Sequence, residues 1–181
     1  MSTNEIVVLE SSHRPRLGIR GVELNRWLDA SGYSAGSECN VAYAQSDGSV
    51  IGRLSVGELL WLGVAGISPD EKMIGIEQDF RCYRVSRRDS HAWFEMRGTQ
   101  APQLLAKLCG VDLRPEFFTD KSIAQTSVAR VSAIVIRWNE GDAPVYHLLV
   151  DSSFARYFYK SILDAKLEFE NPQGEPHQPT D

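Results

Sequence analysis

The most regular hydrophobic pattern in the chain runs from Ala92 to Arg97, where apolar and polar positions alternate. One face carries Ala92, Phe94 and Met96, and the other carries Trp93, Glu95 and Arg97. A period of two is typical of a strand that buries one of its faces. We therefore predict a strand that is buried on the Phe94 side and ends at Gly98.

The segment that follows changes to a helical period. Ala101, Leu104, Leu105 and Leu108 recur at i, i+3, i+4 and i+7, which predicts an amphipathic helix. Thr99 can cap its start, and Gly110 is expected to end it in a left-handed conformation.

Shorter apolar runs predict further strands at residues 17–21, 41–45, 50–54, 58–64 and 145–150, with weaker candidates at 72–76 and 82–85. Asp47 and Gly48 separate two of these runs and are typical of a hairpin turn. Trp61 lies in a nearly continuous apolar run, which favours a place in the core over a ligand platform. Residues 126–138 are long for one strand, so we expect a bend near residues 130–132 before pairing with 145–150.

Two more helices are predicted, one at residues 22–30 and one that Asp151, Ser152 or Ser153 can cap. The apolar positions of the last helix are Phe154, Tyr157, Phe158, Ile162 and Ala165. Counting Tyr159, four aromatic residues lie within six positions, which is more than one helix face can bury. They either pack in the core or remain partly exposed for a partner, and the pattern leaves both open.

A weak internal repeat connects the two halves of the chain. LGIRGVELNRWLDASG and FEMRGTQAPQLLAKLCG share a strand that ends in Arg-Gly, a leucine seven residues after that glycine, and a terminal glycine. We therefore predict an α+β fold of two similar β-α-β-β units with mostly antiparallel sheet. Residues 16–169 would form one compact domain with halves 16–86 and 87–169. Residues 1–15 would be a flexible arm, in which residues 6–9 could add an edge strand, and 170–181 a disordered tail.

Composition narrows the functional classes. The 181 residues are 43% hydrophobic and 24% charged, as expected of a soluble globular protein, and no apolar run approaches the length of a membrane span. A net charge of −5 argues against nucleic-acid binding, because that depends on concentrated lysine and arginine. We expect a cytoplasmic protein without membrane or nucleic-acid partners. The three cysteines form no metal-ligand spacing and are expected to be reduced thiols in or near the core.

The residues that could carry chemistry have ordinary structural explanations. Asp89, Ser90 and His91 have the residue types of a catalytic triad, but neighbours on an extended segment point in alternate directions. His147 is expected to be a hydrogen-bonded sheet histidine, and Cys109 to be a packing residue. Arginines 81, 84, 87 and 88 could meet an anion, although a solvated connector explains them better. We predict no catalytic, cofactor-binding or metal-binding residue.

Several side chains remain as possible contacts to a partner or an anion. These are Arg97, Asp112, Arg114, Arg130, Phe154, Tyr157 and Tyr159. Asp112 and Arg114 follow the central helix, where they could pair with each other in a structural turn or contact a partner. Arg130 lies at the expected bend and could bind a carboxylate if it faced a cleft.

The order and spacing of several motifs resemble the gamma subunit of heterotetrameric sarcosine oxidase and, more distantly, the folate-binding fold of the glycine-cleavage aminomethyltransferase. The motifs are Ser90-His91-Ala92-Trp93-Phe94 leading to Arg97-Gly98, residues 101–113, Ala124 to Arg130, Tyr146 to Ala155, Arg20-Gly21, and GELLWLG at residues 57–63. The resemblance covers roughly residues 16–169.

The resemblance implies a non-catalytic subunit of a flavoenzyme complex that oxidatively demethylates N-methyl amino acids such as sarcosine. FAD, FMN, NAD and tetrahydrofolate would be held by larger alpha and beta subunits, and zinc by a small delta subunit. The aminomethyltransferases carry an aspartate on the strand after the first helix, where residues 125–129 of this chain have no carboxylate. The alternative is a stand-alone folate-binding or one-carbon-transfer protein with a pocket between its halves.

Overall fold

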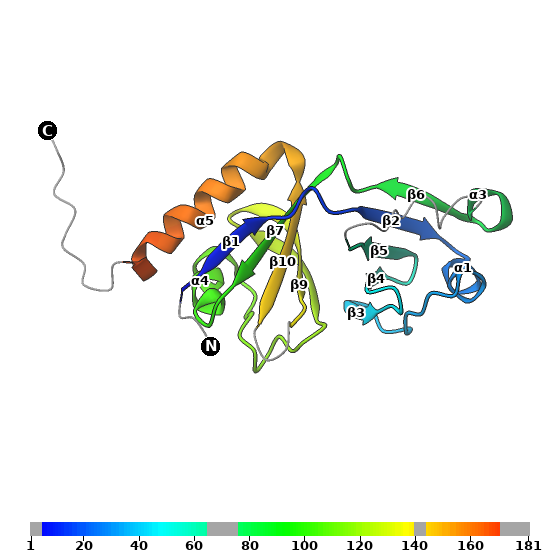
Figure 1. The fold of residues 1–181 in the computed structure, drawn as a ribbon, viewed down its shortest axis with the longest axis horizontal. Coiled ribbons are helices and arrows are strands. Elements are labelled where there is room, and N and C mark those ends of the chain that lie inside the picture. Colours follow the sequence, from blue (N-terminus) through cyan, green and yellow to red (C-terminus); the bar gives the residue numbers. More distant parts are fainter. Residues whose placement is uncertain (1–4, 65–75, 140–143, 171–181) are drawn as a thin grey trace, which may run out of the picture.

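The computed structural model describes residues 5–64, 76–139 and 144–170, which form two five-stranded antiparallel sheets with helices on their outer faces (Figure 1). The first sheet has the order β1-β7-β10-β9-β8. Its strands are β1 (Val7–Glu10), β7 (His91–Arg97), β8 (Ile123–Val128), β9 (Val131–Arg137) and β10 (Val145–Asp151). Helix α4 (Ala101–Leu108), the 3-10 turn η1 (Ser152–Phe154) and helix α5 (Ala155–Glu170) complete this half.

The second sheet has the order β3-β4-β5-β2-β6. Its strands are β2 (Arg16–Gly21), β3 (Val41–Ala44), β4 (Val50–Ser55), β5 (Glu58–Leu62) and β6 (Cys82–Ser86). Helix α1 (Leu24–Ser31) lies on its outer face, and a short helix α3 (Ile76–Asp79) precedes β6. The predicted α+β fold with mostly antiparallel sheet is confirmed.

The two sheets repeat one topology and exchange their outermost strands. In the first sheet the strands are ordered β7-β10-β9-β8, and in the second sheet the corresponding strands are ordered β2-β5-β4-β3. In each half a helix, α4 or α1, follows the first of these strands in the chain. The fifth strand is crossed over: β1 precedes β2 in the chain but pairs with β7, and β6 precedes β7 but pairs with β2. The halves are therefore interlocked, with the connections between the strands passing each other at the top of Figure 1.

The glycine of each repeat permits this exchange. A Cβ at Gly21 would lie 2.2 Å from the carbonyl oxygen of Arg81, and a Cβ at Gly98 would lie 2.4 Å from that of Glu5. Arg81 and Glu5 come just before the two exchanged strands. Because such distances are too short for any side chain, glycine is required where each exchanged strand meets the other half.

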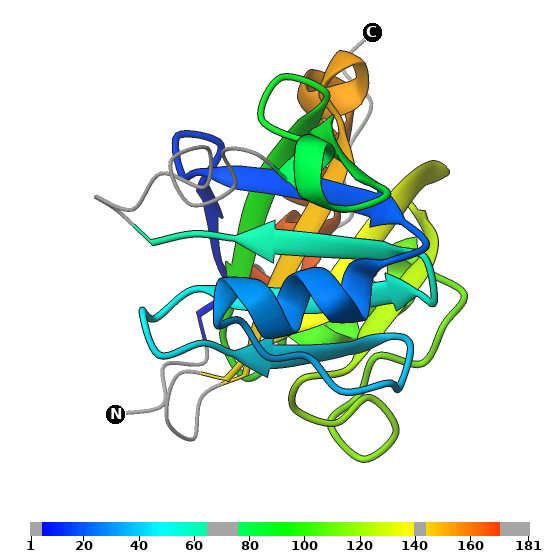
Figure 2. The same ribbon diagram turned by 90° about the vertical axis from the view of Figure 1, so that its right-hand side faces the viewer.

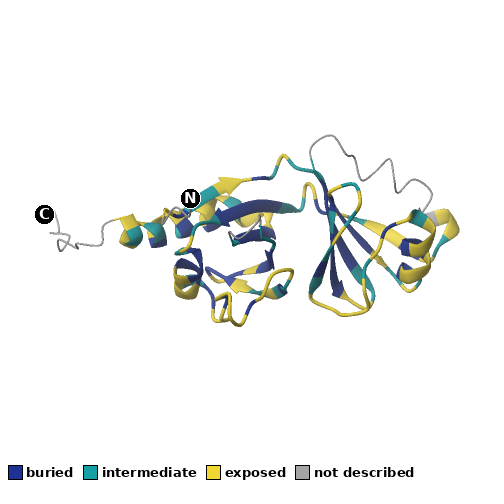
Figure 3. Cartoon of the chain, turned by 60° about the horizontal axis from the view of Figure 1, so that its bottom comes forward, coloured by how far each residue is buried: buried dark blue, intermediate teal, exposed yellow. Residues whose placement is uncertain are grey.

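Three apolar layers result from this arrangement. The outer face of the first sheet packs on α4 and α5 around Phe94, and that of the second sheet packs on α1 around Trp61. Between the sheets lies a third cluster that includes Trp93, Leu60 and Ile136. Figure 2 shows the strands of the second sheet running across those of the first, and Figure 3 shows the buried residues on both sheets.

The inner strand β7 differs from its prediction, because it is buried on both faces. Phe94 and Met96 face the helices as expected, but Trp93 is 1% exposed and Glu95 is 2% exposed. The alternation of residue types is real, yet the polar face meets the second sheet instead of solvent.

Other local expectations are also corrected. Residues 126–138 do not bend within one strand; β8 and β9 form a hairpin closed by Ala129 and Arg130, whose φ angles are 49° and 65°. Helix α4 ends at Cys109, which has an extended φ of −134°, and not in a left-handed Gly110. The predicted strand at 72–76 lies mostly outside the described residues, and the described Ile76 begins α3. Of the disordered tail predicted at 170–181, Glu170 is instead the last residue of α5, and residues 171–181 lie outside the described residues.

Within the arm predicted for residues 1–15, the edge strand that residues 6–9 could add is observed as β1 (Val7–Glu10). Strand β1 pairs with β7 from Val7↔Arg97 to Glu10↔Phe94, and Ile6 is 2% exposed in the helix-side core. Ser11 is also buried, and its amide donates to the Trp93 carbonyl at 2.7 Å. The arm supplies an edge strand and part of the crossing connection.

A buried arginine holds the two crossing connections together. Arg16 is 3% exposed, and its guanidinium donates hydrogen bonds to five backbone carbonyls. The acceptors are Ser12 and Arg14 on the β1–β2 connection, and Arg87, Arg88 and His91 on the β6–β7 connection. Burial, and then the nearby charge of Arg88, lowers the pKa of Arg16.

We expect Arg16→Lys to lower the free energy of unfolding by about 2–4 kcal/mol, because one ammonium group cannot reach carbonyls on both connections. Urea unfolding followed by circular dichroism measures the change. Arg26→Lys is the matched control, since the Arg26 side chain is 70% exposed, and it should change stability by less than about 0.5 kcal/mol. Equal effects of the two substitutions would show that the buried network contributes little.

Candidate functional site

A buried charge cluster lies between the sheets beside the β1–β2 connection. Glu95 accepts hydrogen bonds from Arg14 and from Arg97, the latter at 2.7 Å. Burial raises the pKa of Glu95, but the hydrogen bond from Arg97 and the charges of Arg14 and Arg97 outweigh it, so that the pKa is lowered. Glu95 is therefore a charged, paired carboxylate at neutral pH, and the predicted partner contact Arg97 is one of its ion-pair partners.

His147 and Trp93 extend this cluster. The indole Nε1 of Trp93 donates to His147 Nδ1 at 3.1 Å, and that Nδ1 lies 3.5 Å from Glu95. Because an indole nitrogen can only donate, His147 Nδ1 carries no proton in this arrangement. The prediction of a hydrogen-bonded sheet histidine is confirmed.

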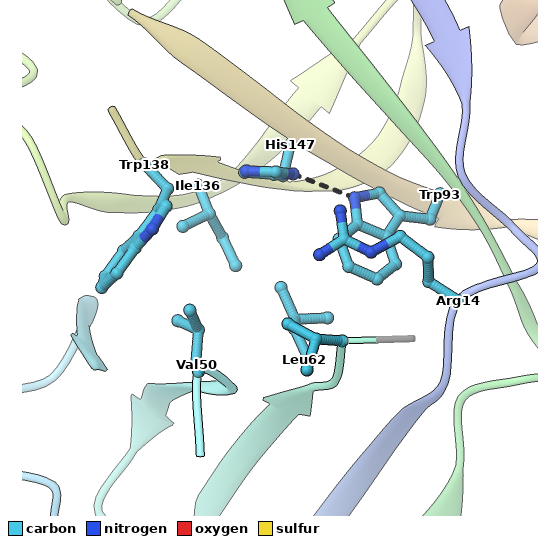
Figure 4. Close-up of a pocket in the computed structure, with 9 residues that line it drawn as sticks. Arg14, Val50, Leu62, Trp93, Ile136, Trp138 and His147 are labelled. Atoms are coloured by element: carbon cyan, nitrogen blue, oxygen red, sulfur yellow. Dashed lines mark hydrogen bonds between the residues drawn. The ribbon is translucent and has the colours of Figure 1, made fainter. Parts of the chain in front are cut away.

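A cavity of about 190 Å³ adjoins the cluster (Figure 4). Its lining is Arg14, Gly48, Val50, Leu62, Val64, Trp93, Ile136, Trp138 and His147. Strands β4 and β5 form one wall, and β7, β9 and β10 form the other. The cavity is thus built from both halves of the chain.

A second charge cluster lies beside the β6–β7 connection. Glu58 pairs with Arg20 at 2.9 Å and with Arg87 at 2.5 Å. Each cluster therefore joins one carboxylate to the arginine of an Arg-Gly strand end, Arg97 or Arg20, and to an arginine of a crossing connection, Arg14 or Arg87. The repeat predicted from the sequence extends to its ion pairs.

The Ser90–His91 pair is not arranged for nucleophilic catalysis. His91 Nε2 lies 2.8 Å from Arg87 Nη1 and accepts from it, so Nδ1 carries the ring proton and donates to Ser90 Oγ at 2.8 Å. The Ser90 hydroxyl donates to the Ser86 carbonyl at 2.6 Å. Hydrogen bonding thus runs from histidine to serine, the reverse of a nucleophile and its base. The two side chains do interact, which the sequence pattern did not lead us to expect.

An open groove of about 490 Å³ runs past this second cluster. Arg20, Glu58, Arg87 and His91 line one part of it, and residues of β8 and β9 line the rest. Gln125 on β8 donates to Asn40 at 2.9 Å and to the Leu54 carbonyl at 2.8 Å. The groove is polar, and its carboxylate Glu58 is engaged by two arginines.

Two of the predicted contact residues pair with each other. Arg114 Nε lies 2.9 Å from Asp112 Oδ1, and its amide also donates to that oxygen at 3.1 Å. The hydrogen bonds from the Arg114 side chain, then that from its amide, lower the pKa of Asp112. Of the two alternatives from the sequence, the pairing within a turn is the one observed.

The remaining predicted contacts gather where α5 begins. Phe154 is 50% exposed and Tyr157 is 49% exposed, and the Tyr157 hydroxyl donates to the Ala129 carbonyl at 3.1 Å. Arg130 is exposed beside Ala129 in the β8–β9 turn. Tyr159 is 37% exposed and stacks on the buried Phe94, with 5.8 Å between ring centroids. Phe158, Ile162 and Ala165 are buried as predicted, so the aromatic set is divided between core and surface.

The arginine-rich segment does not form one basic patch. Arg87, just after β6, is buried on Glu58, whereas Arg81, just before β6, bonds to Glu23. Cys82 and Cys109 are buried as expected, but Cys39 is exposed. Within residues 5–64, 76–139 and 144–170 no group of side chains could hold a metal ion, and no helix is long and apolar enough to cross a membrane.

Sequence reasoning missed part of each cluster. Arg14 and Glu58 were not singled out, Glu95 was assigned to an outward face, and Arg16 of the crossing connection was also missed. The one available signal was the repeated Arg-Gly strand end, because both of its arginines are ion-paired to these carboxylates.

Comparison with known proteins defines the fold. No protein-family model matches the chain, and no curated protein matches it. The solved structures of similar fold include heterotetrameric sarcosine oxidase from Corynebacterium sp. U-96, in complex with pyrrole 2-carboxylate. It has a TM-score of 0.81 and 18% identity over 97% of this chain and 90% of that chain.

Glycine cleavage system aminomethyltransferase T from Bartonella henselae is also similar, with a TM-score of 0.70 and 14% identity over 91% of this chain and 47% of that one. At these identities the similarity establishes the fold. The chain has the α+β fold that a sarcosine oxidase subunit shares with about half of an aminomethyltransferase.

We expect the His91 environment to make folding pH-dependent. Burial and the charge of Arg87 lower the pKa of His91 from 6.5 to about 4. As pH falls from about 6.5 to about 4, the unfolded chain takes up this proton before the folded one, so stability decreases. The full shift corresponds to about 3 kcal/mol, and partial exposure of the ring reduces the expected loss to about 1–2 kcal/mol.

Urea unfolding between about pH 4.5 and pH 7 measures the free energy of unfolding as a function of pH. This free energy should depend less steeply on pH for His91→Gln than for the natural protein. His13→Gln is the control, because His13 is exposed, and it should retain the natural slope. Identical slopes for His91→Gln and the natural protein would contradict the assignment.

Proposed function

We propose that the chain is a non-catalytic subunit, of the gamma type, in a sarcosine-oxidase-like flavoenzyme complex. The complex would oxidatively demethylate N-methyl amino acids in a tetrahydrofolate-linked reaction in the cytoplasm. The observation that carries the proposal is the reciprocal match to one sarcosine oxidase chain, which spans 97% of this chain and 90% of the other. The matched subunit is therefore nearly the same size, as expected if this chain takes its place.

The ion pairs and hydrogen bonds of the charged and polar residues support a non-catalytic role. Glu95 is held by Arg14 and Arg97, and Glu58 by Arg20 and Arg87. Ser90 and His91 have the wrong hydrogen-bond direction for nucleophilic attack. The lowered pKa of Glu95 makes it a poor proton donor or acceptor at neutral pH.

The groove beside Glu58 does not fit independent folate chemistry. Residues 125–129, on β8 and its turn, carry no carboxylate, and Gln125 is occupied by Asn40 and the Leu54 carbonyl. We therefore assign FAD, FMN, NAD and tetrahydrofolate to larger alpha and beta subunits, and zinc to a small delta subunit.

The surface where α5 begins is the contact that we propose for a larger subunit. Phe154 and Tyr157 are half exposed, and Tyr157 bonds to the carbonyl of Ala129, the neighbour of the exposed Arg130. Aromatic and arginine side chains are enriched at the centres of interfaces. Arg130 is held at a positive φ of 65°, a conformation that costs about 1 kcal/mol or more in a residue other than glycine.

The isolated chain should bind neither flavin nor tetrahydrofolate. Calorimetric titration with tetrahydrofolate should show no saturable heat at micromolar concentrations, and the purified chain should be colourless. Saturable micromolar binding of tetrahydrofolate would favour the alternative, a stand-alone folate-binding or one-carbon-transfer protein.

Tagged chain expressed in its own cells should co-purify with flavin-bearing subunits and with sarcosine-dependent formation of hydrogen peroxide. The double substitution Phe154→Ser, Tyr157→Ser should lower recovery of the flavin-bearing subunits by about tenfold or more, because interface aromatics commonly contribute about 2 kcal/mol each. Val56→Ser is the control, since Val56 is 81% exposed on a distant turn. Recovery of the chain without any flavoprotein would contradict the proposed role.

A further inference from the structure

The cavity beside Glu95 has the construction of a small-molecule site. Figure 4 shows Trp93 and Trp138 on opposite sides, Val50 and Leu62 along one wall, and His147 and Ile136 along the other. Its volume of about 190 Å³ suits a molecule the size of one substituted ring. An apolar cavity with a few convergent polar groups is the usual form of such sites.

One end of the cavity carries the guanidinium of Arg14, which is ion-paired with the buried carboxylate of Glu95. The Arg14 guanidinium lies 4.4 Å above the centre of the Trp93 ring, which fixes its position at the cavity wall. Glu95 and the Gly63 carbonyl accept hydrogen bonds from it, the latter at 3.5 Å. A guanidinium has five N–H donors, so further donors remain for a ligand.

The Arg14 guanidinium at this end selects the class of ligand. A cation would be repelled by Arg14, and a neutral apolar molecule would cover guanidinium donors without giving them an acceptor. An anionic carboxylate can accept from Arg14, while a flat apolar body contacts the two indoles and the aliphatic wall. His147 adds an imidazole whose Nδ1 is engaged by Trp93.

We propose that this cavity binds a small aromatic or other planar carboxylate, with its carboxylate on Arg14 and its ring against Trp93 and Trp138. The site is built from both halves of this chain, so binding is a property of the isolated protein. It is independent of whether the chain assembles with flavin-bearing subunits, and the two proposals fail separately.

Titration of the full chain with benzoate tests the site, with tryptophan fluorescence as the readout because two tryptophans line the cavity. For a ligand of about nine heavy atoms we expect saturable binding with a dissociation constant of about 1 mM or lower. Benzyl alcohol, which is neutral, should bind at least about tenfold more weakly. Equal binding of the two probes, or no saturation by benzoate at about 20 mM, would overturn the assignment.

Two substitutions locate the binding. Val50→Phe fills the cavity without touching the charge cluster and should weaken benzoate binding about tenfold or more, whereas Val56→Phe on an exposed turn should leave it unchanged. Arg14→Met should remove the preference for benzoate over benzyl alcohol. Circular dichroism checks that each variant is folded. If Arg14→Met does not fold, Val50→Phe alone still tests whether benzoate binds in the cavity. Benzoate binding to folded Val50→Phe at natural affinity would overturn the proposal.

Discussion

The Arg16 guanidinium is the interaction on which the arrangement of the two sheets depends. It lies where two connections cross, and it bonds to backbone carbonyls on both of them. The two connections leave one sheet and enter the other, so these carbonyls have no partner in a neighbouring strand. Without Arg16, those left buried without a hydrogen bond would lower the free energy of unfolding. The crossing is possible because one planar group with several donors can satisfy acceptors that converge from both sides.

From this crossing the rest of the structure follows. Strand β1 leads into β2 but pairs with β7, and strand β6 leads into β7 but pairs with β2. Each sheet is therefore completed by a strand that is connected directly to the other sheet. The two glutamate clusters stand beside the two connections and link them to the Arg-Gly strand ends. These contacts leave a structure whose charged groups are mostly committed to holding its parts together. Between the sheets they leave a cavity that has the Arg14 guanidinium in its wall.

Much of the fold could be predicted from local patterns. The Asp47-Gly48 turn identified the β3–β4 hairpin, and the period of β7 and α4 gave a strand and a helix at the right residues. The β8–β9 turn was missed because Ala129 and Arg130 are not residues that favour positive φ, and surrounding contacts impose it. Strand β1 is four residues long and obtains its stability from a distant partner, so its local sequence allowed an edge strand without requiring one. The burial of Glu95 was missed for a related reason, since its strand alternates normally and the sheet that covers it comes from elsewhere.

The central claim is that the exchanged strands make the two sheets one cooperative unit. Native-state hydrogen exchange on the full chain measures this directly, because it gives the opening free energy of each backbone amide. The protected amides of β1 and β6 should open with the same free energy as those of the inner strands β7 and β2, within about 1 kcal/mol. Exchange from β1 that is easier by several kcal/mol, or two sheets with separate opening energies, would contradict the account.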